Sequence, residues 1–259
     1  MPPLAKEQIL RAIREAVGGE GLVAVAYLMG SYADGTATHL SDVDVGVGIY
    51  PRPGIDAAEA AWLAADIEHR VTQELFPDYE ADCCPEWLFD PVEVVVLNAP
   101  GTLPSLPWML ACAVPAHAPD PAFQAALEEL AFARGRPSGR QARRAAWRLK
   151  ARWIVRAALG KTFATYEGLL RTCLNLAHRA VVELRLNVPA RRQDLPAALA
   201  EAGVVSPRTA RFVAEAVEML SGENVPLRIW GNLRRNMRLL AEYALDVEEA
   251  LERVVPVDA

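Results

Sequence analysis

The first fifty residues carry a pattern of apolar and polar positions that predicts a helix followed by two strands. Apolar residues recur at helical spacing over 4–17, and two glycines at 18–19 end that run. Residues 22–29 are then continuously apolar, the chain breaks at Gly30-Ser31, and a second apolar run follows a polar loop. This order predicts a strand, a turn and a second strand.

The pattern continues with a second helix and a third strand. A proline-containing loop ends at Gly54, and Asp56 is expected to cap a helix that extends through about Phe76. Residues 77–91 contain prolines and aromatic residues without regular spacing, so we expect a loop or lid there. Residues 92–97 are a nearly continuous β-branched run, which predicts a strand buried on both faces.

Beyond residue 140 the apolar spacing is helical to the end of the chain. Helical patterns cover 161–186, 194–203, 207–221 and 227–254, with breaks at Pro189, Gly203 and Pro226. Glycine, proline and serine gather at 135–139 and indicate a domain boundary. The sequence therefore predicts an α+β protein, with a domain of strands and helices over 1–135 and an all-α helical bundle over 136–259.

Composition and charge narrow the classes of protein. The chain has 259 residues, of which 52% are hydrophobic, which is enough for two modest domains with buried cores. Its net charge of −6 argues against a general nucleic-acid binder. The absence of a long apolar run and of a signal peptide predicts a soluble cytoplasmic protein without membrane association. The four cysteines lack zinc-ligand spacing, so we expect them to be reduced and mostly buried.

The second predicted strand carries a candidate metal site. Asp42 and Asp44 are two residues apart, so in an extended strand their side chains project from the same face. Two neighbouring carboxylates repel each other unless a cation lies between them, and oxygen ligands suit a hard ion such as Mg²⁺. Gly30 lets the backbone approach a phosphate closely, and the Ser31 hydroxyl can donate a hydrogen bond to it.

The spacing of these residues carries a resemblance to a known family. Gly30-Ser31, ten residues and Asp42-Val43-Asp44 resemble the signature of the polymerase-beta-type nucleotidyltransferases, in particular the minimal nucleotidyltransferases. The resemblance implies a mixed sheet with helices and metal-dependent transfer of a nucleoside monophosphate, AMP from ATP, to a hydroxyl. Asp42 and Asp44 would hold Mg²⁺ or Mn²⁺, and Gly30 and Ser31 would bind the nucleotide phosphates. The simpler alternative is a Gly-Ser turn followed by a strand with solvent-facing aspartates.

Glu93 is the one polar residue in the run 92–97. A buried carboxylate is costly without a partner, so it must reach an exposed face or be paired. The family takes a third carboxylate from a later strand, where Asp is commoner, and Glu93 resembles that residue. It would then complete the metal site and draw the proton from the acceptor hydroxyl. The alternative is an exposed glutamate on a strand edge.

The turn after Gly30-Ser31 departs from the family. These proteins often read Ala-Arg-Gly there, whereas this chain places Asp34 between Ala33 and Gly35. The added negative charge predicts weaker nucleotide affinity or a different nucleotide pose, unless basic residues elsewhere compensate. One source is a stripe at every fourth position, formed by Arg140, Arg144, Arg148, Arg152 and Arg156. One interpretation is that the stripe is a solvent-exposed helix face whose arginines form ion pairs with the chain's excess acidic residues. The other is that it forms a basic surface that faces a triphosphate or an RNA-like substrate.

The helical part resembles the HEPN domains of bacterial toxin–antitoxin pairs, whose partners are minimal nucleotidyltransferases. The likeness covers 165–253 and is carried chiefly by 182–207 and 223–230. Active members cleave RNA with an Arg, a His and a Tyr. At the corresponding positions this chain has Glu223, Arg228 and Trp230, with Asn224 retained beside the first. Arg is too basic for general acid–base catalysis. Trp lacks the hydroxyl through which a nucleotidyltransferase would modify the tyrosine of the family motif. We therefore expect no ribonuclease activity and no self-modification at that position.

Two other histidine positions have weaker functional interpretations. Arg171 and His178 have an Arg, six residues, His spacing, but they lie in an earlier helix than the family's catalytic pair. His39 lies in the motif loop, the segment between Ser31 and Asp42. There it either contacts substrate or is a surface residue without a role in the chemistry.

The resemblance leaves the partners of the chain open. Besides the nucleoside triphosphate, the acceptor is a protein side chain, a small antibiotic-like molecule or an RNA 3′ end, and the acidic net charge makes RNA the poorest fit. The helical domain would position substrate or form a homodimer, as helical second domains do in aminoglycoside nucleotidyltransferases. A non-enzymatic alternative is a degenerate nucleotide-binding, antitoxin-like protein that neutralises a partner toxin by contact.

Overall fold

The structure is a computed structural model that describes residues 3–51, 57–79, 91–139, 166–220 and 233–254, together with Gln141, Ala142, Ala145, Arg148, Ala151 and Val155. The chain divides into two compact units. Described residues up to Ala142 belong to the first unit, and those from Ala145 onward belong to the second. Within these described ranges, no helix combines the length and apolar character needed to cross a bilayer.

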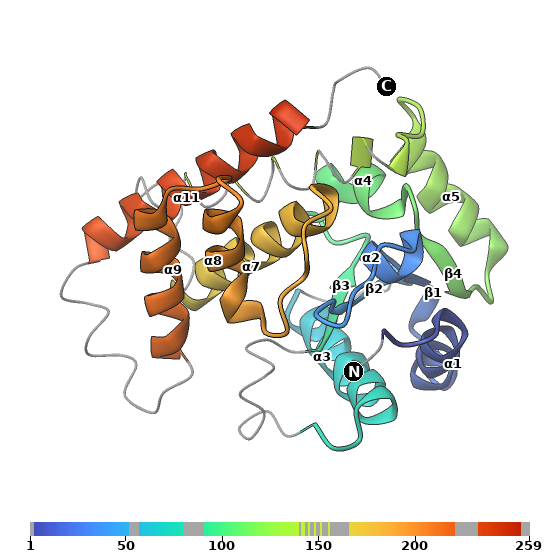
Figure 1. Cartoon of the computed structure of the whole chain (residues 1–259). Coiled ribbons are helices and arrows are strands. Elements are labelled where there is room, and N and C mark those ends of the chain that lie inside the picture. Colours follow the sequence, from blue (N-terminus) through green and yellow to red (C-terminus); the bar gives the residue numbers. More distant parts are fainter. Residues whose placement is uncertain are drawn as a thin grey trace. The chain divides into compact units, whose positions relative to one another are not determined.

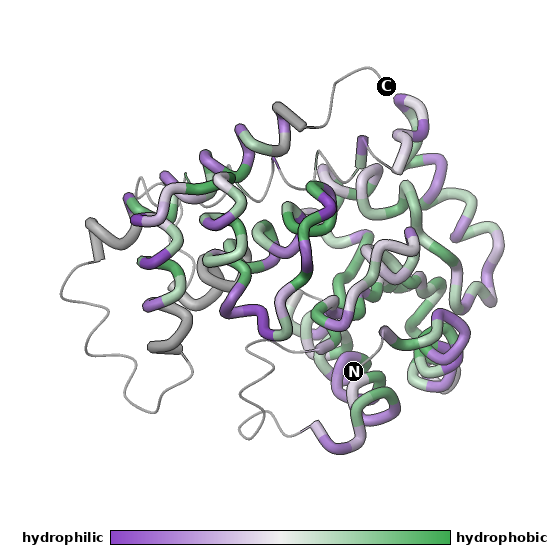
Figure 2. Tube along the Cα trace, in the orientation of Figure 1, coloured by the Kyte–Doolittle hydropathy of each residue, from purple (hydrophilic) through white to green (hydrophobic). Residues whose placement is uncertain are grey.

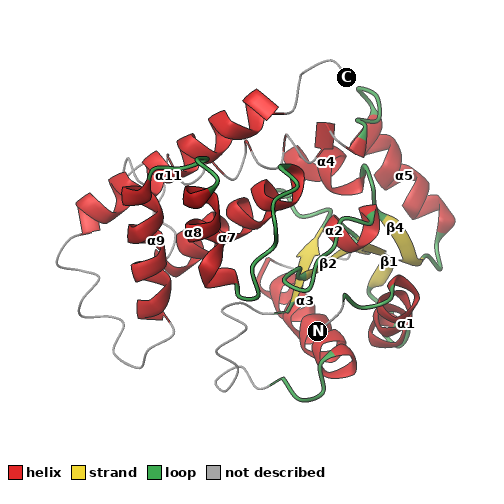
Figure 3. Cartoon of the chain, in the orientation of Figure 1, coloured by secondary structure: helices red, strands yellow, loops and turns green. Residues whose placement is uncertain are grey.

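The first unit contains the predicted helices and strands together with further elements (Figures 1 and 3). In chain order they are α1 (Lys6–Val17), β1 (Val23–Leu28), α2 (Gly30–Asp34), β2 (Val43–Ile49), α3 (Ala57–Leu75), β3 (Val92–Val96), the 3-10 helix η1 (Leu103–Ser105), α4 (Leu106–Leu110), β4 (Val114–His117) and α5 (Pro121–Phe132). The two predicted helices and three predicted strands are confirmed. The Asp56 cap and residues 80–90 of the predicted lid lie outside the described residues.

The strands form one mixed sheet in the order β3-β2-β1-β4. Strand β1 is antiparallel to β2 and to β4, whereas β2 and β3 are parallel. In the parallel pair, Asp44 is the register partner of Glu93. The mixed sheet with helices agrees with the predicted α+β class, and its register brings together two acidic residues that are far apart in the sequence.

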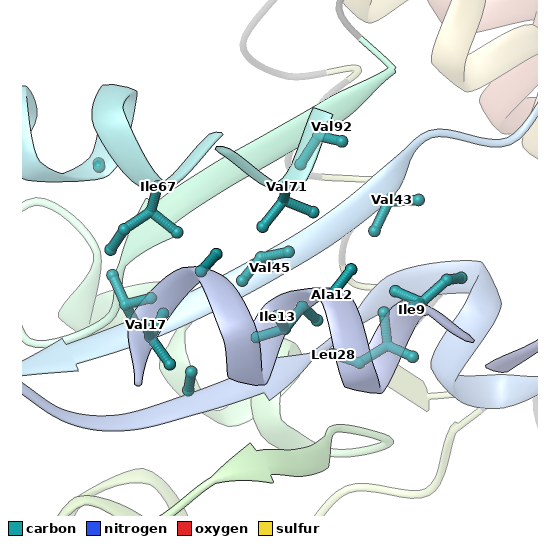
Figure 4. Packing of buried hydrophobic residues seen from close by; sticks show 14 of the residues in the cluster. Ile9, Ala12, Ile13, Val17, Leu28, Val43, Val45, Ile67, Val71 and Val92 are labelled. Carbon is teal, nitrogen blue, oxygen red and sulfur yellow. The ribbon is translucent and has the colours of Figure 1, made fainter. Parts of the chain in front are cut away.

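One face of the sheet packs against α1 and α3. Alternation along β2 directs Val43, Val45 and Val47 to this face, and all three are fully buried. Figure 4 shows the apolar residues of α1 and α3 meeting the valines of the sheet. The residues from the helices include Ile9, Ala12, Ile13 and Val17 of α1 and Ile67 and Val71 of α3. This layer holds β2 firmly from one side.

The opposite face packs against helices α4 and α5. The second apolar cluster contains Val25, Tyr27, Met29, Leu97, Leu106, Leu110, Leu127 and Ala131. Figure 2 shows hydrophobic residues concentrated on the strands, with hydrophilic residues along the outer sides of the helices. The sheet is thus covered on both faces over most of its area, and the polar residues of β2 and β3 must lie where this cover ends.

The expectation that residues 92–97 are buried on both faces is wrong. Strand β3 lies at the edge of the sheet, Glu93 is exposed, and Val94 and Val95 are half-buried. The β-branched run reflects the preference of these side chains for extended backbone, which an edge strand shares with a central strand. Glu93 therefore avoids the cost of burial by facing solvent.

The second unit is helical, as predicted (Figure 3). Its described elements are α7 (Tyr166–Glu183), the 3-10 helix η2 (Arg192–Asp194), α8 (Leu195–Glu201), α9 (Pro207–Leu220) and α11 (Leu233–Val254). Helix α7 packs against α8 and α11, and α9 packs against α8 and α11. The buried residues of α7 and α11 recur at helical spacing, which is the pattern that made this region predictable.

Arg148 is the described member of the predicted arginine stripe, and it pairs with acidic residues of α11. Its guanidinium forms an ion pair with Glu252, and its Nε lies 3.9 Å from Glu248 Oε1. At this position the stripe pairs with the chain's acids, as the interpretation of a solvent-exposed face expected. The other four arginines of the stripe lie outside the described residues.

The core of the helical unit contains a tyrosine whose hydroxyl has no hydrogen-bond partner among the described residues. Tyr243 is fully buried, and burial raises the pKa of its hydroxyl. A buried hydroxyl without a partner costs about 1–3 kcal/mol. We therefore expect Tyr243→Phe to increase the free energy of unfolding by about 1 kcal/mol, measured by urea denaturation.

Tyr27 provides the matched control for that substitution. It is buried to a similar degree, but its hydroxyl donates a hydrogen bond to Glu128 Oε1 at 3.2 Å. Tyr27→Phe is expected to lower the free energy of unfolding by about 1 kcal/mol, because a satisfied hydrogen bond is lost. A destabilisation of similar size in Tyr243→Phe would contradict the prediction and would indicate that the buried hydroxyl has a hydrogen-bond partner beyond the described residues.

Candidate active site

Two carboxylates of the candidate site come from the start of β2. The strand begins at Val43, so Asp42 immediately precedes it and Asp44 is its second residue. The strand's alternation sends Val43 into the core with α1 and α3, and it sends Asp42 and Asp44 to the other side. Both aspartates are half-buried.

The third carboxylate arrives through the parallel pairing of β2 and β3. Because Glu93 is the register partner of Asp44, their side chains project from the same face of the sheet. Asp42, Asp44 and Glu93 each offer a carboxylate oxygen, and these three oxygens all lie within 4.8 Å of one another. Among the described residues, this is the one group of three metal-ligating side chains that lie so close together. The sequence-predicted triad is therefore assembled in space.

Such a cluster has a clear electrostatic requirement. Three carboxylates at this separation repel one another, and a bound cation would remove the repulsion. The donors are all oxygen atoms, which matches the preference of Mg²⁺ and Mn²⁺ and differs from the nitrogen and sulfur sets preferred by zinc. Glu93 is exposed, so the cluster is open to solvent on one side and can accept further ligands from a substrate.

Gly30 stands directly against Asp44. Its φ of +62° is in the left-handed region. A Cβ at this position would stand 1.7 Å from Asp44 Oδ2, so no side chain can be accommodated while the carboxylate keeps its place. The backbone N–H of Met29 donates to the Asp44 carbonyl at 2.8 Å, which fixes the chain entering Gly30 to the same strand residue. The glycine therefore brings the start of α2 into contact with the acidic cluster.

Ser31 is buried beside this contact. It is 1% exposed, and its Oγ has no hydrogen-bond partner among the described residues. Leaving a buried hydroxyl unpaired is costly, so the site gains stability if a ligand oxygen accepts its hydrogen bond. The predicted turn at Gly30-Ser31 is in fact the first turn of the five-residue helix α2. This helix was missed because a single helical turn is too short to show a periodic pattern.

The carboxylate of Asp34 is engaged in the turn that ends α2. Its Oδ1 accepts hydrogen bonds from the Thr36 backbone N–H at 3.0 Å and from Thr36 Oγ1 at 2.5 Å. Gly35 adopts a φ of +78° and donates its N–H to the Ser31 carbonyl. Where the resembled family often has an arginine, this chain therefore has a residue that stabilises the turn.

The rest of the motif loop is ordered by two hydroxyl side chains. Ser41 Oγ accepts a hydrogen bond from the Thr38 backbone N–H at 2.9 Å, and Thr38 Oγ1 accepts one from the Leu40 N–H at 3.2 Å. Ser41 is buried directly before Asp42, so these bonds fix the approach to the strand. His39 lies between them and is half-buried. Its contact with substrate remains a prediction.

The first residue of α1 and the chain just before this helix hold α2 in place. Lys6 Nζ donates to the Ala33 carbonyl at 2.7 Å, and the Leu4 backbone N–H donates to the Tyr32 hydroxyl at 3.4 Å. Burial raises the pKa of Tyr32, and the nearby negative charge of Asp42 raises it further. Sequence reasoning missed Lys6 and Tyr32, because their importance depends on how α1 packs. The position of Tyr32 beside Ser31 was the one available signal.

Of Arg171, His178 and the HEPN-like candidate residues of the helical unit, the structure describes the side chain of His178 alone. His178 is 4% exposed within α7, as expected for a structural residue, and the side chain of Arg171 is not among the described ones. Residues 221–232, which include Glu223, Arg228 and Trp230, lie outside the described residues. Cys173 is buried and Cys112 is half-buried, both as free thiols, while Cys83 and Cys84 also lie outside the described part.

Comparison with known protein families agrees with the site geometry. Residues 6–75 match the family model of a nucleotidyltransferase domain of the polymerase-beta type. The matched segment runs from α1 to α3 and includes Gly30, Ser31, Asp42 and Asp44, and it ends before Glu93 and the helical unit. No curated protein matches the chain. Residues 6–75 are thus similar to a nucleotidyltransferase domain, and this similarity supports transfer of a nucleoside monophosphate in general terms.

Proposed function

We propose that this nucleotidyltransferase domain transfers AMP from ATP to a hydroxyl group of a protein or small-molecule acceptor, with Mg²⁺ or Mn²⁺ as cofactor. The observation that carries the proposal is the convergence of three carboxylate oxygens within 4.8 Å, beside a glycine and a buried serine hydroxyl that has no hydrogen-bond partner in the described part of the chain. Acidic residues that hold metal ions next to a phosphate-binding turn are the arrangement that phosphoryl-transfer chemistry requires.

Asp42, Asp44 and Glu93 are the residues that would hold the metal. Their oxygen donors and mutual repulsion fit a hard divalent cation. When bound, such a cation screens the phosphate charges and lowers the pKa of the acceptor hydroxyl. The half-buried Asp42 and Asp44 are the better-fixed ligands, whereas the exposed Glu93 is the one that solvent and acceptor can reach.

The residues of the turn would orient the nucleotide. The Ser31 hydroxyl would donate its free hydrogen bond to a phosphate oxygen, and Gly30 would let the phosphates approach the backbone. In the transfer step, the acceptor oxygen forms a bond to the α-phosphorus while the bond from that phosphorus to the pyrophosphate oxygen breaks. Glu93 would take the proton from the acceptor hydroxyl, and pyrophosphate would leave with the electron pair of the broken bond.

The second domain is proposed to be HEPN-like and to lack ribonuclease activity. With domains assigned to 1–135 and 136–259, the helical part would position the acceptor or form a homodimer, and a toxin-like protein is one candidate acceptor in the cytoplasm.

Two observations argue against a nucleic-acid acceptor. The net charge is −6, and the described arginine of the stripe, Arg148, pairs with acidic residues of α11.

Calorimetric titration with nucleotides tests the proposal directly. We expect ATP to bind in the presence of Mg²⁺ and to bind at least about tenfold more weakly without it, because the acidic cluster repels the triphosphate when no metal is present. Titrating GTP, CTP and UTP under the same conditions establishes the base preference. Binding of ATP with no AMP transfer to any acceptor in an extract would favour the antitoxin-like alternative. No binding of any nucleotide to folded protein would refute the proposal.

A further inference from the structure

Glu93 belongs to an edge strand of the sheet. Among the described residues, β3 pairs with β2 on its inner side and with no strand on its outer side. The hydrogen bonds at the two ends of this pair follow the alternation of a parallel ladder. Val43 donates to the Pro91 carbonyl at 2.9 Å, and Leu97 donates to the Val47 carbonyl at 2.8 Å. Odd-numbered residues of β3 therefore turn their backbone groups toward β2, and even-numbered residues turn theirs outward.

The outward N–H of Val94 is bound by a side chain from α3. Glu68 Oε2 accepts a hydrogen bond from this N–H at 3.2 Å. Glu68 is half-buried, and the neighbouring Ile67 is anchored in the apolar layer between α3 and the sheet (Figure 4). A side-chain oxygen from a well-packed helix thus accepts the hydrogen bond that a further strand would otherwise accept from the edge backbone.

We propose that Glu68 is a positioning residue that holds Glu93 in the acidic cluster by fixing the adjacent Val94 to α3. Glu93 is exposed, so its carboxylate is located chiefly by the backbone that carries it. Val94 directly follows Glu93 in the strand, and Asp44 is the partner of Glu93 across the sheet. The strand is therefore held from both sides at the one point where it contributes a ligand. This inference rests on the proposed metal site.

The test measures Mn²⁺ affinity, by the loss of the free-ion electron paramagnetic resonance signal, in nucleotide-free full-length protein. Glu68→Ala is expected to weaken Mn²⁺ binding about tenfold, at the lower end of effects seen when support behind a ligand is removed. Glu68→Gln keeps a carbonyl acceptor and should remain within about twofold of the wild type. Glu74→Ala removes an exposed glutamate of the same helix and serves as the matched control.

Three comparisons separate positioning from other effects. If Glu68 acts through Glu93, then Glu68→Ala adds no further loss of affinity in a Glu93→Gln background, so the effects are non-additive. Equal losses in Glu68→Ala and Glu68→Gln would show that charge matters and would overturn the proposal. Additive losses in the double variant would overturn it as well.

Hydrogen exchange provides a second readout that does not depend on metal. A peptide covering 92–97 should exchange faster in Glu68→Ala and at the wild-type rate in Glu68→Gln and Glu74→Ala. Unchanged exchange in Glu68→Ala would overturn the proposed clamp even if affinity fell. If the wild type itself binds no Mn²⁺, the proposed metal site fails and Glu68 has no ligand to position, a result visible before any variant is compared.

Discussion

Replacing Asp42 and Asp44 together by Asn is expected to abolish nucleotidyl transfer while leaving the domain folded. The two carboxylates supply most of the negative charge that would hold the metal, and metal-ion catalysis contributes several kcal/mol of transition-state stabilisation. The rate should therefore fall by about 1,000-fold or more, measured as incorporation of labelled AMP. In the absence of metal the variant should be as stable as the wild type or more stable, because two repelling charges have been removed.

Thermal unfolding with and without Mg²⁺ gives the same substitution an independent readout. A ligand that binds the folded state raises its stability, so Mg²⁺ should raise the melting temperature of the wild type and leave that of the double variant unchanged. Glu74→Gln with Asp78→Asn is the matched control, because both residues are exposed and the change in net charge is the same. Transfer that persists in the Asp42/Asp44 variant while the control is normal would show that the site is assigned wrongly.

The sequence was sufficient to predict which carboxylates the fold brings together, because most of that information is local. The apolar runs around Gly30-Ser31 and the two-residue spacing of Asp42 and Asp44 are properties of adjacent residues, and strand alternation converts them directly into geometry. Glu93 was identifiable for a related reason. A carboxylate in an otherwise β-branched run must face solvent or have a partner, because burying it alone is costly. The parallel pairing of β3 with β2 places this carboxylate beside Asp44.

The features that sequence reasoning missed depend on tertiary contacts. Nothing adjacent to Lys6 or Glu68 indicates that one binds the Ala33 carbonyl and the other binds the edge of β3. The same limit explains the error in β3, because a β-branched run indicates extended backbone and does not indicate the position of a strand in a sheet. Helix α2 was taken for a turn because five residues are too few to show helical periodicity.

Gly30→Ala is expected to lower both the stability of the domain and its affinity for metal, although Gly30 itself offers no metal ligand. The new Cβ would require an alanine at a φ of +62° and would stand 1.7 Å from Asp44 Oδ2. The left-handed conformation costs about 1–2 kcal/mol, and overpacking costs about 1–3 kcal/mol more. We expect the free energy of unfolding to fall by roughly 2–5 kcal/mol, and Mn²⁺ affinity to fall at least tenfold because the Asp44 carboxylate is displaced.

Gly35→Ala isolates the backbone contribution from the displacement of Asp44. Gly35 has a φ of +78°, but no described atom lies within 4 Å of the point that a Cβ would occupy, so alanine there meets only the conformational cost of about 1–2 kcal/mol. Mn²⁺ binding should survive in Gly35→Ala and fail in Gly30→Ala. Adding Asp44→Ala to Gly30→Ala should recover part of the lost stability, because the clashing oxygen is gone, and that coupling is measurable as a double-mutant cycle. Wild-type Mn²⁺ affinity in Gly30→Ala would contradict the close contact between this glycine and the acidic cluster.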